Sequence, residues 1–105
     1  MRYLVELTPT AAEANRIDAG EGPGPIFAYI AERFKPEALY GNPTRRGAYL
    51  VVELETPAQM AELMYLSAWA LGTDPVFTPL ISPEVYGEAI AAAKKAPFLA
   101  SGIPR

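Results

Sequence analysis

The sequence predicts a single α+β domain of the split β-α-β type, on three observations. The chain has 105 residues, which is the usual size of one domain. Half of its residues are hydrophobic and a fifth are charged, as in packed globular proteins. Its apolar pattern changes between period two and helical spacing in the order strand, helix, strand, strand, helix, strand, helix. We expect one domain over residues 1–105, with its core at 1–81 and a C-terminal helix and tail at 82–105.

The first part of the chain predicts a strand followed by an interrupted crossover helix. Residues 2–8 place Tyr3, Val5 and Leu7 on one face and Arg2, Leu4 and Glu6 on the other, with the aromatic and β-branched content of a strand. Thr10 is a suitable N-cap for a short helix over residues 11–19. Residues 20–25 are too rich in Gly and Pro to be helical, yet helical spacing returns over 26–34. The break is either a surface loop that lets the second part repack on the sheet or a flexible flap over a cavity.

A hairpin and a well-capped helix follow. Residues 37–41 and 48–55 predict two strands, joined by turn residues at 42–47. Thr56, with Pro at the first helical position and Gln at the third, begins a helix that ends at Gly72. The spacing predicts that one stripe of this helix is buried, formed by Met60, Ala61, Met64, Ala68 and Leu71.

The C-terminal part predicts an edge strand, a helix and an apolar tail. Residues 74–81 are extended in pattern but contain two prolines, which lack the N–H that an inner strand needs. Ser82 and Pro83 then begin a helix that runs to Lys95. The tail over 97–105 carries Phe98, Leu99 and Ile103, so we expect it to dock on the body or on a neighbouring chain.

This order of elements predicts a ferredoxin-like, four-stranded antiparallel sheet with its helices on one face. Alternation places a mixed set of side chains on the other face: Leu4, Glu6, Tyr49, Val51 and Glu53. This set is too apolar for solvent and too polar for an ordinary core. Two such sheets packed about a two-fold axis would cover it and leave a lumen between them. We therefore expect a homodimer.

Composition excludes several classes of function. The net charge of −3 and a pI near 4.9 argue against nucleic-acid binding. The chain has no Cys and no His, which removes thiol chemistry, His-metal sites and His-based triads. No apolar run reaches the length of about 18 residues that a membrane span needs. We expect a cytoplasmic protein with no metal, no cofactor and no membrane or nucleic-acid partner.

Three segments carry a resemblance to a known superfamily: the strand Arg2-Tyr3-Leu4-Val5, the helix from Met60 to Leu71 with Trp69, and the run from Phe77 to Ile81 ahead of an acidic helix start. With the order of elements, they resemble the dimeric α+β barrel superfamily over residues 1–95. Within it the chain is similar to muconolactone isomerase-like proteins and to small bacterial proteins of unknown function, the DUF3303-like group. The resemblance implies homodimers whose facing sheets enclose a small-molecule site.

Two classes of function stay open at this point. The first is a small-molecule-binding homodimer without turnover, whose ligand-binding candidates are Leu4, Tyr40, Tyr49 and Val51. The second is a cofactor-independent isomerase or monooxygenase for a small organic acid or aromatic compound, with Glu6 and Glu53 as acid or base and Tyr49 as an orienting group. Those carboxylates could instead pair with Arg2, Arg45 or a cation of a partner chain. Tyr65 and Trp69 are candidates for an interface with a second copy or with another protein.

Overall fold

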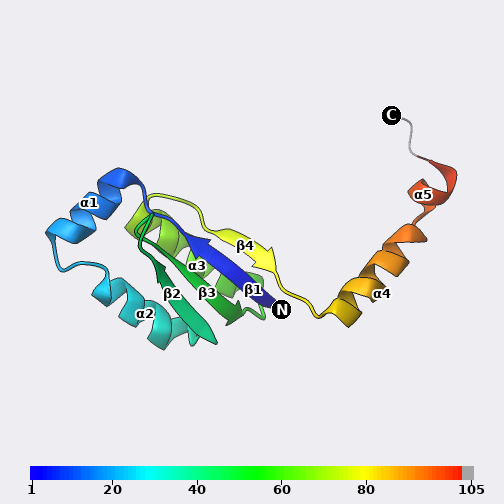
Figure 1. Cartoon of the computed structure of the whole chain (residues 1–105), viewed down its shortest axis with the longest axis horizontal. Helices are drawn as coiled ribbons and strands as arrows, with labels where there is room; N and C mark the ends of the chain where they lie inside the picture. The colour runs from blue at the N-terminus through cyan, green and yellow to red at the C-terminus, as the bar shows by residue number, and fades with distance from the viewer. Residues whose placement is uncertain (103–105) are drawn as a thin grey trace.

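In the computed structural model, which describes residues 1–102, a four-stranded antiparallel sheet carries helices on one face (Figure 1). The strands are β1 (Arg2–Leu7), β2 (Ala38–Asn42), β3 (Gly47–Glu53) and β4 (Val76–Pro79), and the helices are α1 (Ala11–Ala19), α2 (Gly24–Phe34), α3 (Pro57–Leu71), α4 (Pro83–Lys94) and α5 (Pro97–Ser101). The strand order is β2-β3-β1-β4, and each neighbouring pair is antiparallel. This arrangement fits the ferredoxin-like fold that the sequence predicts.

The core lies between the sheet and the helices and is centred on β1 and β3. Val5 and Leu50 are register partners, and both are fully buried. Ile30 of α2 and Leu63 of α3 belong to the same buried cluster. Full burial of one such side chain contributes about 1.5–3 kcal/mol. In the predicted strand over residues 48–55, alternate residues face the core, since Ala48, Leu50, Val52 and Leu54 are all buried.

The buried stripe of α3 differs from the predicted one. The ends of the helix are as expected, with a capping box at Thr56 and a left-handed Gly72. The buried face, however, is formed by Leu63, Ser67, Ala70 and Leu71, whereas Ala61 is exposed and Met60, Met64 and Ala68 are only half-buried. Ser67 tolerates burial because its hydroxyl donates a hydrogen bond to the Thr73 carbonyl at 2.7 Å. Of the predicted stripe, Leu71 is buried as expected, and the rest of the buried face lies on the neighbouring side of the helix.

The predicted interruption of the first crossover helix is confirmed. Thr10 caps α1 by accepting a hydrogen bond from the backbone N–H of Glu13 at 3.1 Å, and the N–H of Gly20 closes its last turn. Gly22 then takes a left-handed conformation with φ of 78°, which favours glycine. Pro25 lies in the first turn of α2, where its missing N–H has no helical partner to lose. The crossover therefore consists of two short helices.

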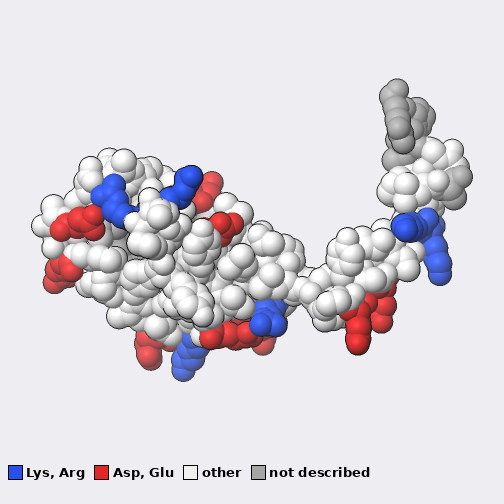
Figure 2. Space-filling model, viewed as in Figure 1, with Lys and Arg blue, Asp and Glu red and all other residues white. Residues whose placement is uncertain are grey.

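The face of the sheet away from the helices is bare in the single chain. Figure 1 looks onto the strands with α3 behind them, and Figure 2 shows a broad uncharged area on this side of the body. Tyr40 and Val76 on this face are 67% and 56% exposed. The closure of two such faces into a dimeric α+β barrel stays a prediction.

The C-terminal helices form an arm that leaves the body of the protein (Figure 1). We define this arm as residues 83–101, which contain α4 and α5. With it the chain measures 58 × 31 × 27 Å. Phe98 and Leu99 do not pack into the body as expected for a docked tail, since they are 49% and 56% exposed. Ile103 lies outside the described residues. In the described residues, no helix has the length and apolar character needed to cross a membrane.

A close approach between two strands makes Gly47 sensitive to substitution. A Cβ at this position would overlap the carbonyl oxygen of Leu7 in β1. We predict that Gly47→Ala lowers the free energy of unfolding by about 1–3 kcal/mol, because the backbone of β1 or β3 must shift. Gly41→Ala is the matched control in the same hairpin, since its Cβ would lie 3.7 Å from the Phe27 ring, an ordinary contact. Urea unfolding measures both, and equal stability of Gly47→Ala and the wild type would contradict the prediction.

Candidate functional site

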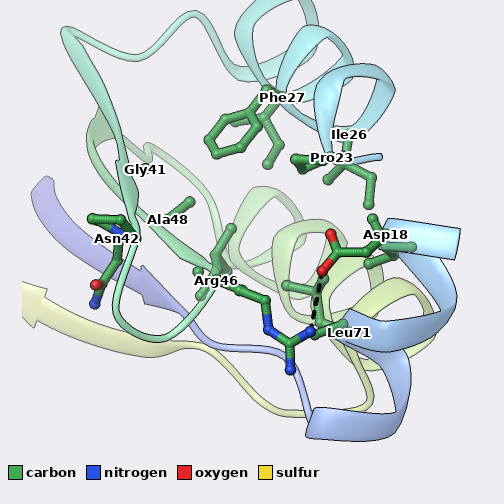
Figure 3. Close-up of a pocket in the computed structure, with 15 residues that line it drawn as sticks. Asp18, Pro23, Ile26, Phe27, Gly41, Asn42, Arg46, Ala48 and Leu71 are labelled. Atoms are coloured by element: carbon green, nitrogen blue, oxygen red, sulfur yellow. Dashed lines mark hydrogen bonds and ion pairs between the residues drawn. The ribbon is translucent and has the colours of Figure 1, made fainter. Parts of the chain in front are cut away.

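The described part of the chain contains an apolar cavity of about 460 Å³ between the α1–α2 crossover and the sheet. In Figure 3, Pro23, Ile26 and Phe27 project into it from the crossover, and the β2–β3 hairpin lies opposite. Its apolar walls are formed chiefly by Leu7, Ile17, Ile26, Phe27, Ile30 and Leu71. The cavity therefore lies on the helix-bearing face of the sheet.

Small residues account for the space. Gly41, Gly47 and Ala48 line the cavity from the hairpin, and Ala14 lines it from α1. Ala14 and Ala48 are 3% and 8% exposed, so they are packed positions with short side chains. The two crossover helices are joined by a Gly- and Pro-rich loop, so they do not follow the line of one continuous helix across the sheet. Short side chains beneath a broken helix leave a cavity that larger residues would fill.

A charged group closes one side of the cavity. Nη1 of Arg46 donates a hydrogen bond to Oδ2 of Asp18 at 3.1 Å (Figure 3). It donates another to Oδ1 of Asn15 at 2.8 Å. Arg46 has a left-handed backbone with φ of 56° at the end of the hairpin turn. The side chains of Arg46 and Asp18 are 44% and 51% exposed, so their ion pair contributes little to stability. These contacts nevertheless join the hairpin to α1 at the rim.

The predicted ligand-binding residues Leu4, Tyr40, Tyr49 and Val51 lie together on the bare face of the sheet. Leu4 pairs with Val51, and Tyr40 pairs with Tyr49. The hydroxyl of Tyr49 accepts a hydrogen bond from Nδ2 of Asn42 at 3.2 Å. The four residues form one surface, but in the single chain that surface is open, whereas the cavity is on the other face. Their role in binding stays a prediction.

The two predicted acid–base candidates share the bare face but are well separated along it. Glu6 is the register partner of Tyr49 and Glu53 is the partner of Arg2, an offset of four residues, or about 13 Å along the strands. Glu53 contacts the amino group of Met1 at 2.8 Å, whereas Arg2 pairs with Glu37 at 2.9 Å. Glu53 therefore pairs with the N-terminal amino group, and not with Arg2 or Arg45 as considered from the sequence.

Tyr65 and Trp69 lie on the outer face of α3, where they are 68% and 84% exposed. This is the side of the helix on which the sequence places them, away from the buried Leu63 and Ser67. Their assignment to an interface stays a prediction. Among the described residues there is no group of His, Cys, Asp and Glu side chains that could hold a metal ion.

The cavity residues were not identified from the sequence. They come from β1, α1, α2, the β2–β3 hairpin and the end of α3, so no local motif contains them. The only advance signal is the Gly- and Pro-rich break at residues 20–25, for which a flap over a cavity is one of the two interpretations. Once the strand register is known, a second signal comes from the short residues Gly41, Gly47 and Ala48. The register brings them together in the hairpin, where they leave space beneath the crossover helices.

Comparison with known proteins leaves the family open. No protein-family model matches the chain, and the searches of curated proteins and of solved structures also gave no match. The resemblance to the dimeric α+β barrel superfamily therefore stays a prediction. The function has to be argued from the site itself.

An exposed ion pair clamps α2 to α3 beside the core. Arg33 donates to both carboxylate oxygens of Glu62, from Nε at 2.7 Å and from Nη2 at 2.8 Å. The hydrogen bond from Arg33 holds the pKa of Glu62 below its ordinary value of 4.5, and the same contact raises the pKa of Arg33. This two-point geometry is the stronger form of a surface ion pair.

The lowered pKa gives a pH-dependent prediction for Glu62→Gln. A carboxylate with a lowered folded-state pKa stabilises the protein above its unfolded pKa, and this contribution is lost as the pH falls through the folded value. We therefore expect Glu62→Gln to be less stable than the wild type at pH 7, with the difference disappearing as the pH falls below 4.5. Urea unfolding at a series of pH values measures it. A deficit of the same size at pH 7 and in acid would contradict the assignment.

Proposed function

We propose that the protein binds a small, mainly apolar organic molecule in the cavity between α1, α2 and the sheet. The observation that carries this proposal is the cavity volume of about 460 Å³ together with its apolar lining. Small-molecule sites are typically concave, apolar and about 300–1,000 Å³ in volume, with a few polar groups that orient the ligand. The cavity under the broken crossover helix has these properties within one chain.

The polar rim indicates the chemistry of the ligand. Nη1 of Arg46 is engaged by Asn15 and Asp18, but a guanidinium group carries five N–H donors in a fixed fork. A carboxylate or sulfonate at the rim could accept hydrogen bonds from the other donors, while the apolar part of the molecule contacts Ile17, Ile26 and Phe27. The ligand class that fits best is an apolar molecule with one anionic end.

We also propose that the protein acts as a homodimer and that binding involves no turnover. The bare face, with Leu4, Val51 and exposed Tyr40 and Val76, is an extended apolar surface of the kind that proteins cover by association. The alternative of a cofactor-independent isomerase or monooxygenase depends on paired carboxylates. The offset between Glu6 and Glu53 gives that alternative no support.

A cavity-filling substitution tests the proposed site. In Ala48→Leu the larger side chain occupies part of the cavity, and we predict that binding of anilinonaphthalene sulfonate weakens by about tenfold or more, equivalent to about 1.4 kcal/mol. Ala38→Leu is the matched control, because Ala38 is a strand residue on the bare face and pairs with Val51. We expect this control to bind the dye as the wild type does. Fluorescence titration, with decanoate as a non-fluorescent competitor, measures both variants.

Two outcomes would contradict the cavity as the binding site. One is wild-type dye affinity in Ala48→Leu. The other is weakened binding in Ala38→Leu with normal binding in Ala48→Leu, which would place the ligand on the bare face beside Val51 and Leu4. Far-ultraviolet circular dichroism of both variants separates a lost site from a lost fold.

A further inference from the structure

The C-terminal arm is amphipathic although no residue of its main helix, α4, is buried (Figure 1). Helical spacing places five apolar residues on one side of α4: Val85, Tyr86, Ala89, Ile90 and Ala93. The charged residues Glu84, Glu88 and Lys95 fall on the other side, and Lys94 lies at the boundary next to Ile90. No residue of α4 is buried, and Val85, Tyr86 and Ile90 are 47%, 59% and 39% exposed. An apolar side formed in this way needs a surface to cover it.

Helix α4 also needs tertiary contacts in order to be stable. It has 12 residues, and isolated helices shorter than about 12–15 residues are marginal in water. Its N-cap is satisfied, since Oγ of Ser82 accepts a hydrogen bond from the N–H of Val85 at 3.2 Å. A cap contributes only about 1 kcal/mol, which is small beside the conformational entropy of ordering the helix. Packing of the apolar side would supply the rest.

The bare face of the sheet offers the arm an apolar surface. The opposite face of the same four strands is covered by the crossover helices and α3. The arm carries two helices, α4 and α5, and the bare face offers them Leu4, Tyr40, Tyr49 and Val51, with one carboxylate, Glu6, beside Tyr49. Amphipathic helices packed on the free face of an antiparallel sheet give a standard layered architecture.

The geometry of the connection directs the arm away from its own sheet. The N–H of Leu80 still bonds to the carbonyl of Arg2 at 2.8 Å, so the sheet contacts continue past β4. Ser82 is extended, with φ of −67° and ψ of 158°, as expected for a residue that precedes proline. Ile81 is thus the only residue between the sheet and the helix cap. So short a connection leaves little chain with which α4 could turn back onto its own sheet.

We propose that the arm of one copy packs its apolar side, with Val85 and Ile90, on the bare sheet face of a second copy. Each copy carries one arm and one bare face, so reciprocal exchange about a two-fold axis satisfies both and closes the assembly. The arrangement lies on the opposite side of the sheet from the cavity, so it is independent of the proposed ligand site. It is a different dimer from the barrel predicted from the sequence, in which the two sheets face each other directly.

The first test uses matched substitutions on the two sides of α4. We expect the full-length protein to be a dimer by light scattering on a sizing column. Ile90→Asp places a charge on the apolar side and should convert the dimer to a monomer at the same concentration. Ala91→Asp places the same residue on the charged side of the same helix and should leave the dimer intact. A dimer that is insensitive to Ile90→Asp, or a wild-type monomer, would overturn the proposal.

Cysteine crosslinking then identifies the surface that the arm contacts. The chain has no native cysteine, so Ile90→Cys and Val51→Cys variants with different tags can be co-expressed and oxidised. We expect a mixed disulfide between the two variants, because Ile90 of one copy lies over Val51 of the other. Crosslinking of Val51→Cys with itself would instead indicate facing sheets. A variant that carries both substitutions in one chain tests whether the arm folds back, because it would then form a disulfide within single chains. Either that result or crosslinking of Val51→Cys with itself would overturn the proposed exchange.

Discussion

Three glycines and two prolines between residues 20 and 25 prevent the first crossover from forming one continuous helix. The chain divides there into α1 and α2, and the sheet beneath them presents the short residues Gly41, Gly47 and Ala48. Because none of these side chains reaches across the gap, the two helices enclose space instead of filling it. Arg46 then joins the hairpin to α1 through Asn15 and Asp18 and places the nearest cation at the rim. The cavity, its apolar walls and its single charged side all follow from this break.

The two faces of the sheet have different roles in this account. The helix-bearing face contains the core and the cavity, and residues of one chain form both. Over residues 1–102 no helix covers the bare face, and the amphipathic helix α4 has no buried residue. When two copies associate, the apolar side of α4 in one copy can cover the bare sheet face of the other. Exchange of the arm would therefore stabilise α4 and remove an exposed apolar surface in the same step.

Local signals predicted the strands and helices well, because caps, prolines and alternation act over a few residues. Thr10, Thr56 and Ser82 each begin a helix where expected, and the break after Gly20 is confirmed. Features that depend on contacts between distant segments were harder to predict. The buried stripe of α3 was predicted correctly only at Leu71, because apolar residues occur on most sides of this helix and the buried Ser67 is polar. The cavity was missed because its lining comes from six separate elements, and the single hint was the Gly- and Pro-rich segment.

Methyl NMR of isoleucine-labelled protein tests the central claim most directly, because the isoleucines report on separate regions. Ile17, Ile26 and Ile30 line the cavity. Ile81 lies just before the arm, and Ile90 lies in α4. During a titration with decanoate, the account predicts chemical-shift changes at the three cavity methyl groups and none at Ile81 or Ile90. Changes confined to Ile81 and Ile90, or no change at saturating decanoate, would contradict the claim that the broken crossover forms a ligand site.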